Sequence, residues 1–273
     1  MKRLIPLLLA VLLAVMTSAC KQNIRTDIPL SIDERPYTDF VGKKFGVLDG
    51  TGYQNIAEDI FDSKSIIIYE TANEGVALLE SGAVDALIGD YTASVPWVNE
   101  IGTDKYAISL IPEEYASFDY AAMAKNDETA ELFNSFLAKI TADGTLADMS
   151  KRWVDEYDPE NIPAITDVFK AQNGVDNGEY TIGINTECAP FVMPDKNGNP
   201  TGFEIELMSR FADSQGKSLR FADTSFTNII PLYTSGEFDF VVAMCYDISG
   251  EDNSGILFTD SYSDALLAII YKK

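Results

Sequence analysis

The chain has 273 residues, 46% of them hydrophobic, which is enough for one large or two small α/β lobes. It contains no histidine, so Ser-His-Asp catalysis, Cys-His pairs and the usual zinc sites are excluded, and we expect neither a metal nor a cofactor. The formal net charge of -23 disfavours nucleic acid and anionic membrane surfaces as partners, and it is otherwise typical of a well-solvated surface.

The N-terminus predicts an exported protein. Lys2 and Arg3 form a basic start, and the apolar run over residues 5–16 is too short to span a bilayer as a mature helix. The small residues before Cys20 resemble the lipobox of bacterial lipoproteins, in which the cysteine becomes the lipidated N-terminus. We therefore expect a signal peptide over residues 1–19 and a polar tether over residues 20–40. A plain secretory peptide with an incidental cysteine is the alternative.

The next part of the chain alternates between strands and helices. A glycine-rich turn at residues 50–52 joins the first strand to the first helix, and a further strand is expected at residues 120–125. Asn126 or Asp127 is the expected cap of the following helix, which should carry Leu132, Phe136 and Ile140 inward. The first strand is expected within residues 42–52, further strands near residues 65–69, 84–88 and 106–111, and helices near 53–62 and 72–80.

The last part of the chain repeats this alternation. Residues 155–177 are rich in proline and turn formers and predict a linker, with one helical turn at residues 165–171. Strands are then expected at residues 181–186, 238–244 and 266–271, with helices from Phe203 and over residues 226–232. Residues 80–86 and 234–240 match in chemistry, because each combines a helix end, a Ser-Gly cap and a buried strand. The pattern predicts two doubly wound α/β lobes.

Several motifs together resemble one protein family. Residues 181–191 and 195–204 combine a strand, a Pro-Phe pair, an Asp-x-Asn-Gly turn and Gly-Phe-Glu, and residues 258–262 are Phe-Thr-Asp-Ser-Tyr. These features resemble the N-terminal part of the family 3 bacterial extracellular solute-binding proteins, which are type II periplasmic binding proteins of the amino-acid-binding type. Residues 42–52 resemble the start of that family's second lobe, and residues 143–153 resemble its C-terminal end.

The two halves stand in reversed order relative to that family. We therefore expect a circularly permuted type II periplasmic binding protein fold, in which two lobes enclose a ligand cleft. The resemblance implies lobe two over residues 41–118, lobe one over residues 119–157 and 178–273, and a linker over residues 155–177 that joins the family's old termini. A fragment of a tandem array, or a swapped pair of chains, is the alternative.

Candidate ligand-binding residues lie where strands end, because ligands of open α/β sheets bind at the carboxyl ends of strands. The N–H groups of Gly50, Thr51 and Gly52 could hold an anion, although a tight turn alone would also explain these glycines. By resemblance, Asp90 meets the ammonium group of a ligand and Phe191 lines the floor of the pocket. A helix cap and a core aromatic residue are the alternative roles.

The resemblance is weakest at the ligand signature. Cys188 stands where the family has an aromatic residue on which the ligand stacks, and Asp252 stands where it has the arginine of Thr-x-x-Arg. Without this arginine, a carboxylate loses its bidentate partner, so we expect weak binding of glutamate and aspartate and a preference for neutral or positively charged solutes. The full candidate set is Gly50, Thr51, Gly52, Asp90, Cys188, Phe191, Tyr246, Ser249 and Asp252.

Cys188 and Cys245 are the only cysteines that remain after Cys20, and an exported protein meets an oxidising environment. Each follows an expected strand, and the family resemblance implies that these two strands are neighbours at the edge of the cleft. We therefore expect a disulfide between them. Two buried free thiols are the alternative.

The resemblance implies a lipid-anchored solute-binding protein of the bacterial cell envelope or periplasm, and not an enzyme. It would capture a small polar solute, for example one that resembles an amino acid. It would act with the permease of an ABC-type transporter or with a sensor. We expect a monomer, with a swapped dimer left open. An enzyme of the dehydratase type on the same fold, or a degenerate interaction lipoprotein, is the alternative.

Overall fold

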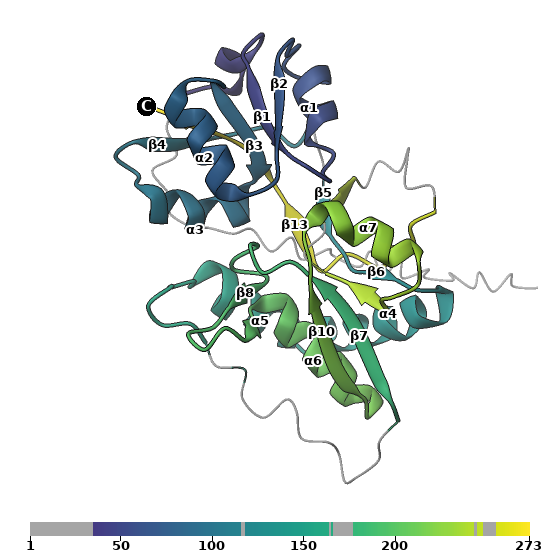
Figure 1. The fold of residues 1–273 in the computed structure, drawn as a ribbon. Coiled ribbons are helices and arrows are strands. Elements are labelled where there is room, and N and C mark those ends of the chain that lie inside the picture. The colour runs from purple at the N-terminus through teal and green to yellow at the C-terminus, as the bar shows by residue number, and fades with distance from the viewer. Residues whose placement is uncertain (1–34, 116–117, 164, 166–176, 243–244, 248–254) are drawn as a thin grey trace, which may run out of the picture.

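The computed structural model describes residues 35–115, 118–163, 165, 177–242, 245–247 and 255–273. The expected signal peptide, Cys20, the helical turn expected at 165–171 apart from its first residue, Ser249 and Asp252 lie outside these residues. The described chain folds into two α/β lobes connected by two crossing segments (Figure 1). Within the described residues no helix combines the length and the apolar character that a membrane span requires.

Lobe two is built on a five-stranded sheet with the order β2-β1-β3-β14-β4. Strand β1 runs parallel to β2 and β3, whereas β14 runs antiparallel to β3 and β4. Alternate residues of the strands point to opposite faces, so Val47 joins a core with α1 and Leu87 joins another with α2 and α3. The elements are β1 (Phe45–Leu48), α1 (Tyr53–Asp59), β2 (Ile66–Tyr69), α2 (Ala72–Ser81), β3 (Ala86–Asp90), α3 (Tyr91–Ile101), β4 (Tyr106–Leu110) and β14 (Leu267–Lys272).

Both ends of the described chain belong to lobe two. Residues 35–40 fall in the expected tether, but they form a 3-10 turn, η1 (Tyr37–Phe40), whose Phe40 is buried. The rings of Phe40 and Tyr271 lie 5.0 Å apart, and the Arg35 guanidinium lies 5.1 Å from the ring centre of Tyr271. The sequence pattern assigned residues 266–273 to lobe one, but the strand pairing puts β14 in the sheet of lobe two. Residues 35–40 and β14 pack against each other through apolar side chains. This packing explains why both segments belong to lobe two.

Lobe one contains a four-stranded sheet with the order β10-β7-β11-β6. Strands β10 and β11 run parallel to β7, and β6 runs antiparallel to β11. Helices α4, α5 and α6 cover one face of the sheet, and α7 covers the other. The elements are β6 (Met123–Ala124), α4 (Asp127–Ala142), α5 (Thr145–Ser150), the π-helical turn η2 (Lys151–Asp155), β7 (Glu179–Ile184), β8 (Met193–Pro194), β9 (Pro200–Thr201), α6 (Phe203–Gln215), β10 (Ser218–Asp223), α7 (Phe226–Thr234) and β11 (Phe240–Val241).

Helix α4 starts where the sequence predicts, because the Asn126 side chain accepts a hydrogen bond from the N–H of Thr129 at 3.0 Å. The expected inward position of Leu132 is wrong, since this side chain is 40% exposed. Phe133 is buried in its place and packs against Phe211 with the ring centres 5.1 Å apart. The buried face of α4 therefore includes Phe133 and not the adjacent Leu132.

Two segments cross between the lobes through a small three-stranded sheet. Strand β5 (Phe118–Tyr120) pairs antiparallel with both β12 (Cys245–Asp247) and β13 (Ser263–Ala265). After β5 the chain enters the sheet of lobe one as β6, so the single strand expected at residues 120–125 is divided between the end of β5 and the short strand β6. After β13 it enters the sheet of lobe two as β14. Each lobe therefore holds an antiparallel strand delivered by a segment that comes from the other lobe.

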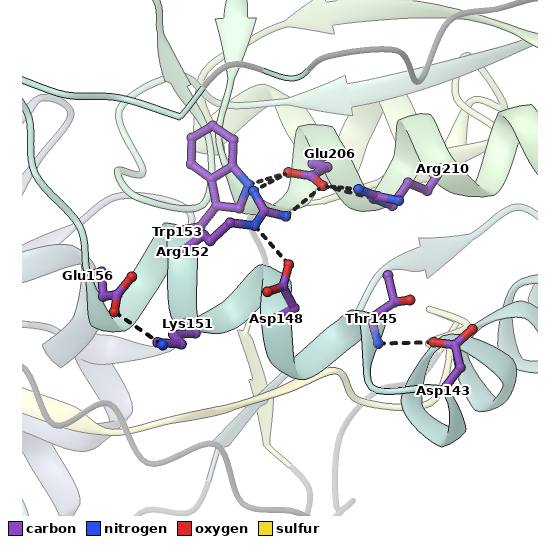
Figure 2. Close-up of polar contacts among 9 residues, drawn as sticks. All are labelled: Asp143, Thr145, Asp148, Lys151, Arg152, Trp153, Glu156, Glu206 and Arg210. Carbon is purple, nitrogen blue, oxygen red and sulfur yellow. Dashed lines mark hydrogen bonds and ion pairs between the residues drawn. The ribbon is translucent and has the colours of Figure 1, made fainter.

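The early and late parts of the chain meet in lobe one at a buried carboxylate (Figure 2). The Glu206 side chain on α6 is 3% exposed and accepts hydrogen bonds from Trp153 at 2.5 Å and from the guanidinium groups of Arg152 and Arg210. Burial alone would raise the pKa of Glu206, but the hydrogen bonds from Arg152, Trp153 and Arg210 outweigh it and hold the pKa below its ordinary value. The carboxylate thus fastens the η2 turn to α6.

Candidate ligand-binding cleft

A cavity of about 970 Å³ lies between the lobes and touches both of them. Lobe two contributes the turn after β1 and the β3–α3 junction, and lobe one contributes residues 186–189 and Phe226. The hinge strand β5 contributes Tyr120. The predicted site residues that line the cavity are Gly50, Thr51, Gly52, Asp90 and Cys188.

Asp90 ends β3 and begins α3. Its Oδ1 atom accepts the N–H of Ala93 at 2.8 Å, so Asp90 is the N-cap of α3. The residue is only 6% exposed, and its buried Oδ2 atom has no hydrogen-bond partner among the described residues. Burial raises the pKa of Asp90 to about 6, and Ala93 and Tyr120 oppose that rise. The helix cap expected as an alternative role is therefore present at the wall of the cavity.

The turn after β1 uses its own donors. The N–H of Gly50 donates to Oδ1 of Asp49 at 3.0 Å, and the hydroxyl of Thr51 donates to the Leu48 carbonyl at 2.6 Å. The following helix α1 has only seven residues. At this turn the N–H of Gly50 and the hydroxyl of Thr51 are therefore engaged within the chain.

The same turn touches lobe one. Oδ2 of Asp49 accepts the hydroxyl of Thr227 at 3.0 Å. Gly50 has φ +77, and a Cβ atom at this position would lie 2.8 Å from the carbonyl carbon of Phe226. The glycine is therefore required both by its left-handed backbone and by the close approach of the other lobe. The lobes are in direct contact at this side of the cleft.

Phe191 does not line the cavity. It is fully buried and stacks against Tyr120 with the ring centres 4.0 Å apart and an interplanar angle of 26°. Tyr120 is one of the lining residues. Phe191 therefore supports the aromatic residue that faces the cavity.

Several lining residues escaped the sequence analysis. Tyr120 lies on a crossing strand, and such strands must pass the back of the cleft, so its position could have been inferred. Trp97 lies on α3, two turns after Asp90, so its place at the cavity could also have been inferred from the sequence. Tyr157 and Glu160 belong to the expected linker, and nothing in its composition predicted a place beside the cleft.

The charge of the cavity wall is one-sided. Its described lining residues include four acidic side chains, Asp90, Glu100, Glu160 and Glu187, and neither lysine nor arginine. Asp90 is buried, and the other three are exposed. The wall therefore offers acceptors for a cation.

The remaining predicted residues are only partly described. Cys188 is half-buried, and its sulfur lies 3.9 Å from Oδ1 of Asn185. Cys245 and Tyr246 lie on β12, opposite Tyr120 and Asp119 of β5, but the structure describes only their backbone. The disulfide between Cys188 and Cys245 therefore stays a prediction. The described residues contain no cluster of three or more His, Cys, Asp or Glu side chains placed to hold a metal.

Two α/β lobes, each completed by a strand from a crossing segment and facing each other across a cavity, have the architecture of the type II periplasmic binding protein fold. Residues 180–273 match the model of the bacterial extracellular solute-binding proteins, family 3. Over these residues the chain is similar to that family.

Curated relatives match parts of the chain. A probable histidine-binding protein of Neisseria gonorrhoeae is 26% identical over 94 residues, which cover 34% of this chain and 35% of that protein. The ABC transporter arginine-binding protein 1 of Escherichia coli (strain K12) is 25% identical over 125 residues, which cover 44% of this chain and 50% of that protein. The chain thus spans half or less of the length of these relatives.

Solved structures of a solute receptor and of a periplasmic domain also match the chain. The L-cystine solute receptor of Neisseria gonorrhoeae, in its unliganded open conformation, is 31% identical over 24% of this chain and 28% of its own, with a TM-score of 0.23. The periplasmic VFT2 domain of Bordetella pertussis BvgS is 12% identical over 84% of this chain and 80% of its own, with a TM-score of 0.37. Because both TM-scores are below 0.5, we base the fold on the strand order of this chain.

Proposed function

We propose that this protein captures a small polar solute between its two lobes and presents it to an ABC-type transporter or a membrane sensor. The observation that carries the proposal is the cavity between the lobes, which is lined by residues of both lobes and by the buried Asp90. Such concave sites with a few convergent polar groups are typical of small-molecule binding. The family of residues 180–273 and the names of the relatives, which bind histidine and arginine, support the same class of solute.

The test starts from protein purified without added solute. Native mass spectrometry should find a small molecule that leaves on denaturation, and this molecule should raise the melting temperature when it is added back. Turnover of the molecule would instead favour an enzyme on this fold. If no molecule copurifies and no member of a broad solute library raises the melting temperature, the proposal is wrong and a role as an interaction protein gains support.

We also propose that the protein is exported and anchored by a lipid on Cys20. The basic start, the short apolar run and the small residues before Cys20 support this proposal. Wild-type protein should fractionate with membranes after export, and its processing should be blocked by globomycin. Cys20→Ser should release the protein into the soluble fraction. A wild-type protein that is found only in the soluble fraction would contradict the anchor.

We further propose that the chain is a circular permutation of the family fold. In the unpermuted order, the strand that enters lobe two would continue directly into residues 41–48. The packing of Phe40 and Arg35 on Tyr271 supports this order, because it brings the ends of that connection together. A protein in which residues 177–273 precede residues 35–165, joined by a short linker, should fold with the same ligand affinity. Failure of this protein to fold would favour a tandem fragment or a swapped pair.

A further inference from the structure

We infer that the cleft takes an elongated solute with an apolar outer end, namely a short peptide that carries a bulky apolar residue, and not a single free amino acid. This inference rests on the proposed solute-binding function and names the class of solute. It follows from three features of the cavity, which are its size, its length along α3 and the apolar character of its outer part.

The cavity is large for a site that holds one amino acid. Its volume of about 970 Å³ lies near the upper end of the range of about 300–1,000 Å³ that small-molecule sites occupy. Along α3 the lining runs from Asp90, the N-cap, to Ile101, the last residue of the helix. At a rise of about 1.5 Å per residue this distance is about 16 Å. An extended peptide advances by only about 3.3–3.6 Å per residue, so a single amino acid fills a small part of this length.

One face of α3 forms this wall. Lining residues at spacings of three or four positions lie on the same side of a helix, and here they are Asp90, Ala93, Trp97 and Ile101. Trp97 is half-buried and packs partly against the core of lobe two, so its ring is held in place while part of it stays at the cavity. The helix therefore presents a continuous strip from the buried Asp90 to an apolar outer end.

Lobe one faces the outer end of this strip with a second aromatic residue. Burial raises the pKa of Tyr157, and the negative charge of Glu100 adds to the rise. Because Glu100 lies one turn after Trp97 on α3, this interaction places Tyr157 across the cleft from the outer end of the helix. The Tyr157 hydroxyl donates to Sδ of Met193 at 3.6 Å, and the ring packs partly against the core of lobe one. The outer part of the cavity is thus bounded by two fixed aromatic side chains, one from each lobe.

The inner part of the cavity is more polar. Strand β1 runs parallel to β3, so the turn at residues 50–52 lies at the same edge of the sheet as Asp90. Thr51, Asp90 and Ser94 line the cavity there. A solute with a polar inner end and an apolar outer end would contact both parts, and burial of its apolar group against Trp97 and Tyr157 would add to the binding free energy. A single amino acid held at the inner end would leave the outer part unused.

The experiment measures affinities by calorimetry on the full mature chain, freed of any copurifying solute. The probes are the free amino acids and peptides of about two to four residues that contain tryptophan, phenylalanine or leucine. We expect at least one of these peptides to bind about 10-fold or more tightly than every free amino acid. A free amino acid that binds as tightly as the best peptide would overturn the inference.

Two variants test the outer part of the cavity. Trp97→Ala removes its aromatic surface and should weaken binding of the best peptide by about 10-fold or more, and binding of a free amino acid by less. Because Trp97 also packs against the core, Asn99→Trp provides a second test. Asn99 is exposed and lines the cavity, so a large ring at this position should occupy the outer part and weaken peptide binding without disturbing the core.

The control is Tyr115→Ala. Tyr115 is 50% exposed and is not one of the described residues that line the cavity, so its removal should leave the peptide affinity unchanged. The melting temperature shows which variants are folded. Weaker peptide binding in a folded variant of the outer part supports the inference, and unchanged peptide binding in every folded variant would overturn it.

The outcome also separates this inference from the proposed function. If none of the peptides and amino acids binds, but another solute copurifies and raises the melting temperature, the length of this solute decides. A solute no longer than an amino acid overturns the inference and leaves the solute-binding function intact, whereas a longer solute with an apolar end supports both. If no solute of any kind binds, both are wrong.

Discussion

Replacement of Glu206 by glutamine should destabilise the whole protein, because this carboxylate joins the early and late parts of the chain. Oε1 of Glu206 accepts from Arg152 Nη2 at 2.9 Å and from Arg210 Nε at 2.8 Å, and Oε2 accepts from Trp153 at 2.5 Å. In Glu206→Gln the charge is lost, and an NH₂ group must face either the indole N–H or a guanidinium group. At least one donor is therefore left without its acceptor.

The magnitude follows from burial. Removal of one partner from a buried ion pair costs about 3–5 kcal/mol. Here the side chains of Arg152 and Arg210 are 32% and 37% exposed, so water can partly replace the lost carboxylate. We therefore expect a loss of about 2–3 kcal/mol in the free energy of unfolding, which corresponds to a decrease of roughly 4–12 °C in melting temperature for a chain of this size.

The sign of the pH dependence gives a second test. The pKa of Glu206 in the folded protein lies below its ordinary value of 4.5. Its stabilising contribution is therefore present above pH 4.5 and is lost as the pH falls through the lowered pKa. Calorimetric melting of wild type and Glu206→Gln should differ most near neutral pH and converge in acid. The control, Glu131→Gln, removes the same charge from an exposed position on α4 and should melt like the wild type at every pH.

Two results would refute this reasoning. A decrease of less than about 1 °C at pH 7 would mean that the contacts of Glu206 contribute no net stability, as is found for many exposed ion pairs. A difference that grows towards acid would mean that the pKa of Glu206 is raised and not lowered.

Two further substitutions and one mapping experiment test other parts of the molecule. Gly50→Ala should push the lobes apart, raise the radius of gyration in X-ray scattering and weaken ligand binding. The control Gly198→Ala has a similar positive φ and open space around the added Cβ atom, so it should change neither. An unchanged radius of gyration in Gly50→Ala would refute the contact between the lobes at this turn. Asp90→Asn should stabilise the ligand-free protein by up to about 3 kcal/mol at pH 8. The pKa of Asp90 in the folded protein is raised to about 6, so the wild type loses stability as the pH rises through this pKa, whereas the variant does not. The stability difference should vanish near pH 4, and equal stability at pH 8 would contradict the burial of an ionised Asp90. Peptide mapping without reductant should find Cys188 linked to Cys245, and free thiols at both positions would end that prediction.

The sequence was sufficient to predict the alternation of elements, because buried strands and Ser-Gly caps are local signals. The cap at Asn126 is confirmed for this reason. The correct stripe of α4 was missed because Leu132 and Phe133 are equally apolar, and only the packing of Phe211 selects between them. The place of β14 in lobe two was missed because a fully buried strand has the same composition in either sheet.

The site was predicted less completely than the fold. Turn glycines and Asp90 could be identified because they end strands, whereas Tyr157 and Glu160 reach the cavity only through tertiary packing of a segment that looks like a linker. The buried Glu206 was also missed. A glutamate in a helix normally faces solvent, and its arginine partner Arg152 is distant in the sequence.

The antiparallel strand β14 has a consequence for biosynthesis. It occupies an inner position in its sheet, between β3 and β4, and yet it is made only after the entire stretch from Leu110 to Leu267. Until β14 is made, β3 and β4 lack the strand that lies between them, and the nascent lobe exposes unpaired strand edges. Late completion of this sheet delays a compact state while the chain is being translated. If the chain is exported as we propose, such a delay would keep the nascent polypeptide unfolded enough for translocation.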